Sequence, residues 1–239
     1  MPYGLGGKDV LYKASCKPCA KITGALEGRL LRGHWWPYRT VLKLQSRSPS
    51  YPKYESVNLK VPWRESIPAN VRKDEVPLVV ILEFDPPSVL EGIVRIEAPY
   101  APRMCVKFIA PMPTRVLVEG RMRQVESYEQ IEFPTNFSAA DLARFLAKVA
   151  HCHAIYVRGF SACSEYFLPP YILGNGDGAL TYVGGDRASI LGPLMPGSGL
   201  HAMLDRRQGE YLAVNVQLFR DCGDPTPIYD VVVGRLTAS

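Results

Sequence analysis

The chain has 239 residues, of which 47% are hydrophobic and 21% are charged, and its formal net charge is +5. This composition is typical of a globular protein with one domain and an appendage, or with two small domains, and it argues against disorder throughout. No apolar run reaches the roughly 18 residues that cross a membrane, and the N-terminus lacks the apolar stretch of a signal peptide. We therefore expect a cytoplasmic protein with no membrane segment.

The positive charge is concentrated near the N-terminus. Residues 1–50 contain nine Lys and Arg but only Asp9 and Glu27 as acidic residues, a net charge of +7, whereas the remaining residues carry −2. Such asymmetry predicts an anionic partner for the N-terminal segment. A solvated basic face would have the same composition.

Three blocks of different composition follow one another along the chain. Residues 1–44 are basic and contain a C-x-x-C motif. Residues 45–75 are rich in Ser, Pro and Tyr, and we interpret them as linker-like, because five prolines between positions 49 and 77 exclude a long helix. Residues 76–239 are interpreted as an α+β body of unknown function.

One helix of the body is clearly signalled. Ser138 is a good N-cap, Asp141 completes a capping-box pattern, and Phe137 stands at the position of a hydrophobic staple. Apolar residues then recur at helical spacing, which predicts a helix from about residue 139 to 152. The rest of the body is expected to form a mixed, mostly antiparallel sheet. Strands are expected at 77–84, 92–97, 104–109, 115–119, in part of 122–133, at 179–183, and at 211–219 and 228–233 as a hairpin.

Cys16-Lys-Pro-Cys19 is the sharpest motif of the sequence. Two thiolates at this spacing suit adjacent corners of one tetrahedral Zn²⁺, but a structural zinc needs four ligands, and the printed sequence holds no second C-x-x-C. A redox motif would need a preceding strand and a helix that opens at the first cysteine, within a thioredoxin-like fold. The glycine-rich residues before Cys16 and the missing βαβ pattern disfavour that alternative.

The context of the motif is more specific than the motif itself. An apolar residue, a proline, a Gly-Gly pair, an apolar strand and the C-x-x-C occur in order, and a helix with apolar residues four apart comes next. These features are Met1, Pro2, Gly6-Gly7, Val10-Leu11, Cys16, Cys19, and then Ile22, Leu26 and Leu30. In this arrangement residues 1–32 resemble the HNH endonuclease family, in the subgroup whose finger is closed by two C-x-x-C pairs.

The resemblance implies a partial ββα-metal finger over about residues 1–44. It also implies that the ancestral activity is metal-dependent cleavage of nucleic acid, and DNA is the nucleic acid that we expect. It implies a structural Zn²⁺ held in part by Cys16 and Cys19, and Mg²⁺ or a similar divalent ion for cleavage. The rest of the chain resembles the region C-terminal to the finger in uncharacterised HNH-containing bacterial proteins, which implies no activity of its own.

Three departures from the family pattern affect this expectation. The general-base histidine would stand two residues before Met1, the first C-x-x-C would lie further upstream, and Ala20 occupies a slot usually held by Asn. Either the true start lies upstream or the gene is a degenerate fragment, and we expect the chain as printed to be inactive. The alternative function is a non-catalytic module that binds nucleic acid or protein.

Basic side chains near the motif are the candidate contacts to nucleic acid, because Lys and Arg bind phosphates. Trp35 and Trp36 could stack on bases, or they could pack the finger helix onto the body. Neither His151 and His153 nor His201 with Asp205 is assigned a function, and a glycine turn is expected at 174–178. The candidate nucleic-acid contacts are Lys13, Lys17, Lys21, Arg29, Arg32 and Arg39.

Overall fold

The chain folds as the α+β protein expected from its sequence, with helices and antiparallel sheets. The computed structural model describes residue 5 and residues 15–44, 54–61, 64–72, 78–92, 103–108, 115–118, 121–124, 131–132, 138–176, 179–185, 200–220 and 226–237.

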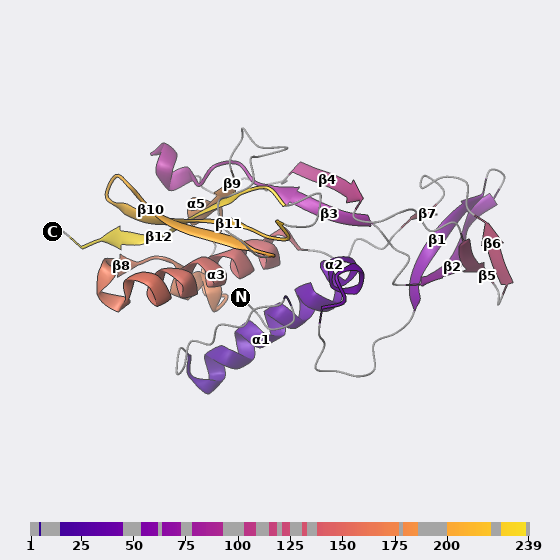
Figure 1. The fold of residues 1–239 in the computed structure, drawn as a ribbon, viewed down its shortest axis with the longest axis horizontal. Helices are drawn as coiled ribbons and strands as arrows, with labels where there is room; N and C mark the ends of the chain where they lie inside the picture. The colour runs from indigo at the N-terminus through magenta and orange to yellow at the C-terminus, as the bar shows by residue number, and fades with distance from the viewer. Residues whose placement is uncertain are drawn as a thin grey trace.

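A central antiparallel sheet and one long helix form the main layers of the molecule (Figure 1). The strands lie in the order β10–β11–β12–β8, and β9 also pairs with β12. The predicted hairpin of the last two long strands is confirmed as β11 and β12. The strands are β8 (Cys163–Tyr166), β9 (Val183–Gly185), β10 (Ala202–Gln208), β11 (Tyr211–Gln217) and β12 (Tyr229–Leu236).

Helix α3 (Ala139–Arg158) covers one face of this sheet. Its start is as predicted, because the Ser138 side chain accepts a hydrogen bond from the Asp141 backbone N–H at 3.3 Å. The helix runs six residues beyond the predicted end at residue 152, because apolar residues continue through the buried Ile155. It stops at Gly159, whose N–H bonds the Ile155 carbonyl and whose φ of 78° suits glycine.

Helices α1 (Lys17–Arg32) and α2 (Trp36–Val41) pack against the same hydrophobic core as α3 and the central sheet. The Trp35 side chain, 1% exposed, meets the Phe145 ring of α3 edge to face, with ring centroids 4.6 Å apart. Tyr38 stacks on Phe219 with centroids 3.8 Å apart. Packing onto the body is therefore confirmed as the role of Trp35, and the described part of block 1–44 shares one hydrophobic core with the central sheet.

A second antiparallel sheet stands at one end of the molecule (Figure 1). Our linker-like interpretation of 45–75 was wrong for most of its length, because residues 54–61 and 64–72 form two paired antiparallel strands of this sheet. Buried Val57 and Leu59 alternate with exposed positions, and Pro68 is accommodated opposite Asn58. The strands, in the order β6–β5–β2–β1–β7, are β1 (Tyr54–Val61), β2 (Arg64–Arg72), β5 (Arg115–Val118), β6 (Arg121–Gln124) and β7 (Ile131–Glu132).

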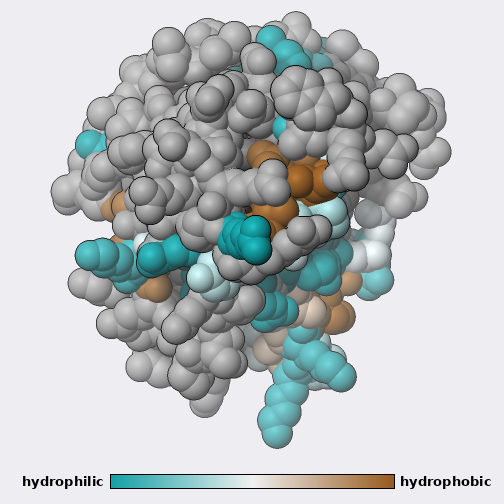
Figure 2. Space-filling model, turned by 90° about the vertical axis from the view of Figure 1, so that its right-hand side faces the viewer, coloured by the Kyte–Doolittle hydropathy of each residue, from teal (hydrophilic) through white to brown (hydrophobic). Residues whose placement is uncertain are grey.

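This second sheet has a small core of its own. Its buried side chains are not among those of the main core. Figure 2 looks onto this end of the molecule and shows mostly hydrophilic side chains in its coloured part, with a small apolar area between them. The buried side chains are Val57, Leu59, Ala69, Val71 and Val118.

The expected strands at 77–84 and 104–109 are confirmed as the paired strands β3 (Leu78–Glu83) and β4 (Arg103–Phe108). A strand was also expected at 92–97. Of these residues only Gly92 is described, and it is a left-handed turn residue that ends the 3-10 helix η3 (Ser88–Glu91). Residues 93–97 lie outside the described ones. The strand expected at 179–183 was wrong. Residues Ala179–Tyr182 form the helical turn α5, and the strand starts only at Val183.

Two glycines of β9 make close backbone contacts that a larger residue would block. A Cβ atom on Gly184 would lie 2.4 Å from the Asp85 carbonyl oxygen, and one on Gly185 would lie 2.7 Å from the Phe84 carbonyl oxygen. Only glycine lets β9 run this close to the chain that follows β3. Two short elements complete the described fold, η5 (Phe160–Ala162) and α4 (Leu168–Ile172).

Candidate nucleic-acid interface and metal half-site

The two cysteines of the motif lie where a helix begins, as the sequence predicted. Cys16 is the N-cap of α1, with extended φ and ψ of −69° and 162°, and its carbonyl accepts the first helical hydrogen bond from Ala20 at 2.9 Å. Pro18 lies in the first turn, where its missing N–H costs no helical hydrogen bond. The two Sγ atoms converge to 3.1 Å. The sulfurs therefore lie close together, as the spacing that suits adjacent corners of one tetrahedron predicted, and a helix follows the motif as expected.

The donor chemistry of this pair fits half of a zinc site. Two thiolates bound tetrahedrally to one zinc at about 2.3 Å lie about 3.8 Å apart, which a small rotation of either side chain reaches. Hydrogen bonds from the backbone N–H and the thiol of Cys19 lower the pKa of Cys16, which favours the thiolate that a metal requires. Across the described residues, no cluster of three or more His, Cys, Asp or Glu could hold a metal. A zinc here would supply a structural cross-link, with these two thiolates as two of its four ligands.

Exposed cations line one side of α1. Lys17 and Lys21 are exposed and stand one helical turn apart, and the first turn of α1 holds no acidic residue. Arg32, at the last position of the helix, is also exposed. At 100° per residue, all three project within about 60° of one another on one side of α1. We call these three residues the basic face of α1.

Two glycines, Gly24 and Gly28, lie on the same side of the helix between Lys21 and Arg32. A Cβ atom at Gly24 would meet nothing within 4 Å, so the backbone is open to close approach there. The Arg32 guanidinium lies over Gly28, where a Cβ atom would come within 2.9 Å of it. The glycines therefore leave room beside the basic face, although they weaken the helix locally.

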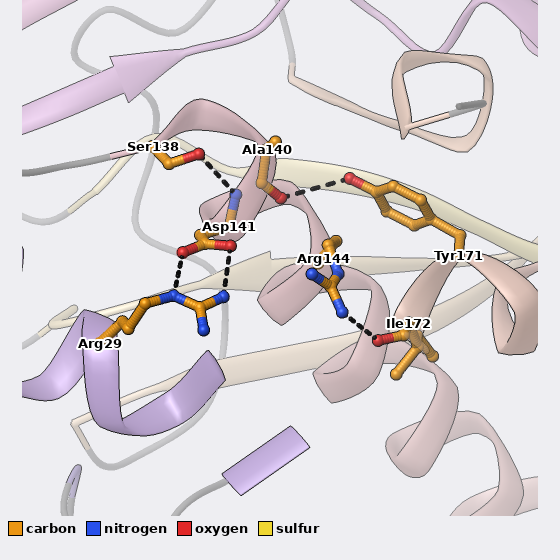
Figure 3. A network of polar contacts seen from close by, with 7 residues as sticks. All are labelled: Arg29, Ser138, Ala140, Asp141, Arg144, Tyr171 and Ile172. Atoms are coloured by element: carbon orange, nitrogen blue, oxygen red, sulfur yellow. Dashed lines mark hydrogen bonds and ion pairs between the residues drawn. The ribbon is translucent and has the colours of Figure 1, made fainter. Parts of the chain in front are cut away.

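The opposite side of α1 is fixed to α3. Leu26 and Leu30 are buried there. Arg29 donates two hydrogen bonds to the Asp141 carboxylate, at 2.7 and 2.8 Å (Figure 3), and Glu27 pairs with Lys148 on the other flank. These contacts orient the helix so that its basic face points away from the body.

Two of the six predicted nucleic-acid contacts have intramolecular partners instead. The Arg29 guanidinium is engaged with the Asp141 carboxylate. Arg39 is only 8% exposed, and its guanidinium donates to the Leu31 carbonyl at 3.2 Å. The bound carboxylate makes Arg29 a poor ligand for phosphate although its side chain is exposed, and burial with a bound partner does the same for Arg39, so we leave both out of the interface. Lys13 lies outside the described residues.

The predicted helix ended at about residue 152 and would have placed His151 and His153 at its end. In the structure α3 continues to Arg158, so both histidines lie within the helix. His153 Nε2 lies 3.8 Å from Asp205 Oδ1, and the other oxygen of Asp205 accepts from Arg158 Nε at 2.6 Å. The His151 ring packs edge to face on Tyr166. Burial lowers the pKa of both histidines, so both are neutral near pH 7.

His201 has a structural task that the sequence did not signal. Its Nε2 donates to the Leu5 carbonyl at 2.8 Å, and its Nδ1 accepts from the Phe219 backbone N–H at 3.2 Å. One neutral tautomer satisfies both bonds. His201 therefore ties the buried Leu5 of the N-terminal segment to the end of β11, across 196 residues of sequence.

The glycine turn expected at 174–178 is described up to Gly176. Gly174 and Gly176 have φ of 85° and 137°, which only glycine adopts readily. The turn joins α4 to α5 and not two strands.

Comparisons of the chain with protein-family models, curated proteins and solved structures gave no match. None of the helices in the described ranges is both long and apolar enough to cross a membrane.

Proposed function

We propose that this chain is an HNH-like protein whose N-terminal segment binds DNA through the basic face of α1. The observation that carries the proposal is the arrangement at the start of this helix: a C-x-x-C pair with converging sulfurs beside Lys17 and Lys21, directed away from the body. Metal-dependent cleavage is the ancestral activity that the resemblance implies. Binding is the function that these described residues can perform.

Charge and helix direction support the same ligand. The first N–H groups of a helix lack helical partners and carry a partial positive charge, which adds to that of the lysines. From Lys17 to Arg32 the basic face extends for about 22 Å along the helix axis, at 1.5 Å per residue. A duplex carries one phosphate charge for about each 1.7 Å of its axis, so it can meet several of these cations at once.

Such binding should be independent of sequence and steeply dependent on salt. Each phosphate contact contributes about −0.9 to the slope of log K against log salt concentration. The affinity is measured by fluorescence anisotropy of a labelled duplex between low and physiological salt. We expect the double variant Lys17→Glu, Lys21→Glu to bind roughly tenfold or more weakly at low salt, with a slope reduced in magnitude by about two.

The matched control carries the same change in total charge elsewhere. Arg121 on β6 and Arg207 on β10 are exposed, and Arg121→Glu with Arg207→Glu should leave most of the affinity and the slope intact. Equal weakening by both double variants would show that only overall charge matters, and it would contradict a localised interface on α1. Binding that does not change with salt would contradict the phosphate-contact model itself.

A further inference from the structure

The first half of α1 projects from the body. Over residues 17–25, seven of the nine residues are exposed, and the other two, Cys19 and Thr23, are half-buried. Burial begins only at Leu26. A helix that lies flat on a protein buries an apolar stripe along its whole length. In Figure 1 this end of α1 points away from the central sheet, so a ligand can reach it from more than one side.

The charges of the basic face stand at both ends of a stretch of small residues. Lys17 and Lys21 lie at the start of α1, and Arg32 lies at its last position. The exposed residues between them on this side carry no more than a methyl group, and they are Ala20, Gly24 and Ala25. The helix backbone can therefore come close to a surface whose anionic rims the cations contact.

The width of a helix matches one groove of one kind of duplex. An α-helix with its side chains is about 10–12 Å wide. The major groove of B-form DNA is about 12 Å wide and about 8.5 Å deep, whereas its minor groove is only about 6 Å wide. An A-form RNA duplex has a deep, narrow major groove that excludes side chains and a minor groove that is wide but shallow. Of these four grooves, the major groove of B-form DNA is the one that a helix can enter.

We propose that the projecting half of α1 lies in the major groove of B-form DNA, with its basic face bound to phosphates along the rims and Gly24 nearest the floor. The inference rests on the proposed function, because it names the duplex and the groove that the same basic face takes. Ala20, Gly24 and Ala25 have no side-chain hydrogen-bond donor or acceptor. The groove is therefore recognised by its shape and charge and not by its base sequence.

A comparison of two duplexes tests the form of the nucleic acid. A DNA and an RNA duplex of equivalent sequence and equal length carry the same number of phosphates, so charge alone gives them similar affinities. Fluorescence anisotropy at low salt measures the binding of the full wild-type chain to each. We expect the DNA duplex to bind at least about tenfold more tightly, because the RNA major groove excludes the helix. Equal affinities, or tighter binding of the RNA duplex, would overturn the proposal.

Chemical probing identifies the groove. Dimethyl sulfate methylates guanine N7, which faces the major groove, and adenine N3, which faces the minor groove. On a DNA duplex saturated with the chain, we expect several-fold protection of guanine N7 and unchanged methylation of adenine N3. Protection of adenine N3 without protection of guanine N7 would place α1 in the minor groove and refute the assignment.

Substitutions at Gly24 test how closely the helix approaches. A Cβ atom there would meet nothing within 4 Å, and Ala and Leu are both better helix formers than Gly, so Gly24→Ala and Gly24→Leu should both fold. Gly24→Ala is the control and should bind DNA as the wild type does. Gly24→Leu should bind about fivefold or more weakly, because its side chain holds the backbone away from the groove floor. Equal affinities of the two variants would contradict the placement of Gly24.

The double variant Lys17→Glu, Lys21→Glu separates this inference from the proposed function. If that variant binds DNA as tightly as the wild type, α1 is not the interface and both proposals fail. If it binds more weakly while the wild type binds the DNA and RNA duplexes equally, the basic face contacts phosphates outside the DNA major groove, and only the groove assignment fails.

Discussion

At the scale of single residues, Asp141 shows how local patterns predict one partner and miss another. Its place three residues after Ser138 predicted the helix start correctly, and its backbone N–H makes the capping bond. The expected capping box assigns its carboxylate to the same turn, but that carboxylate accepts from Arg29, which is 112 residues away. Periodicity and caps are local signals, so no pattern in the sequence announced this pair.

His34 makes stability depend on pH. Burial lowers its pKa from 6.5 to about 4. Between these values the unfolded chain takes up a proton at His34 and the folded chain does not, so the free energy of unfolding falls as the pH falls from 6.5 towards 4. The loss is about 1.4 kcal/mol for each pH unit and about 3 kcal/mol in full.

Urea unfolding at pH 7.5 and pH 5 measures this effect. The wild-type chain should lose about 2 kcal/mol more stability over this interval than His34→Gln, because the variant has no imidazole to protonate at this position. His151 and His153 stay in both proteins, so their titration cancels in the comparison. The same pH dependence in both chains would show that His34 is protonated as easily in the folded state as in the unfolded one.

At the scale of elements, α1 was largely predictable and its partners were not. The C-x-x-C and the apolar residues Ile22, Leu26 and Leu30 predicted its start and its buried side. Leu26 and Leu30 are indeed buried, but Ile22 is 40% exposed, because the first turns of α1 have no covering element among the described residues. The ion pairs that orient the helix involve α3 residues more than a hundred positions away.

This difference gives a matched pair of substitutions. Leu30→Ala removes a side chain from the main core and should lower the free energy of unfolding by about 2–5 kcal/mol. Ile22→Ala removes a similar volume near the surface and should cost about 1 kcal/mol or less. Chemical denaturation of both variants checks the order. Equal losses would mean that α1 is not anchored through Leu30.

The same helix start predicts weak zinc binding. Because the described residues supply two thiolates and a stable tetrahedral site needs four ligands, the chain as printed should keep well under one zinc per molecule after dialysis, whereas a longer chain that carries a second C-x-x-C upstream should keep about one. Elemental analysis of the two proteins measures this. Tight zinc in the shorter chain that disappears in Cys16→Ser, Cys19→Ser would show that other ligands complete the site.

At the scale of the whole molecule, the mixed fold class was predictable and the division into parts was not. Residues 54–72 have strand-like alternation, but their prolines outweighed it in our interpretation. The sheet that contains β1 and β2 is completed by β5, β6 and β7, which follow β3 and β4 in the chain. Sheet pairing between such distant segments leaves no local signal in the sequence. The packing of Trp35 on the body, in contrast, was one of the two alternatives that the sequence offered for this side chain.

Lysine footprinting tests the proposed interface most directly. The chain is acylated with and without saturating duplex DNA at low salt, and modified lysines are quantified by mass spectrometry. We expect several-fold protection of Lys17 and Lys21 on α1, with no change at the exposed Lys60 on β1. Protection of Lys60 with undiminished labelling of Lys17 and Lys21 would place the DNA on the second sheet and contradict the assignment to α1.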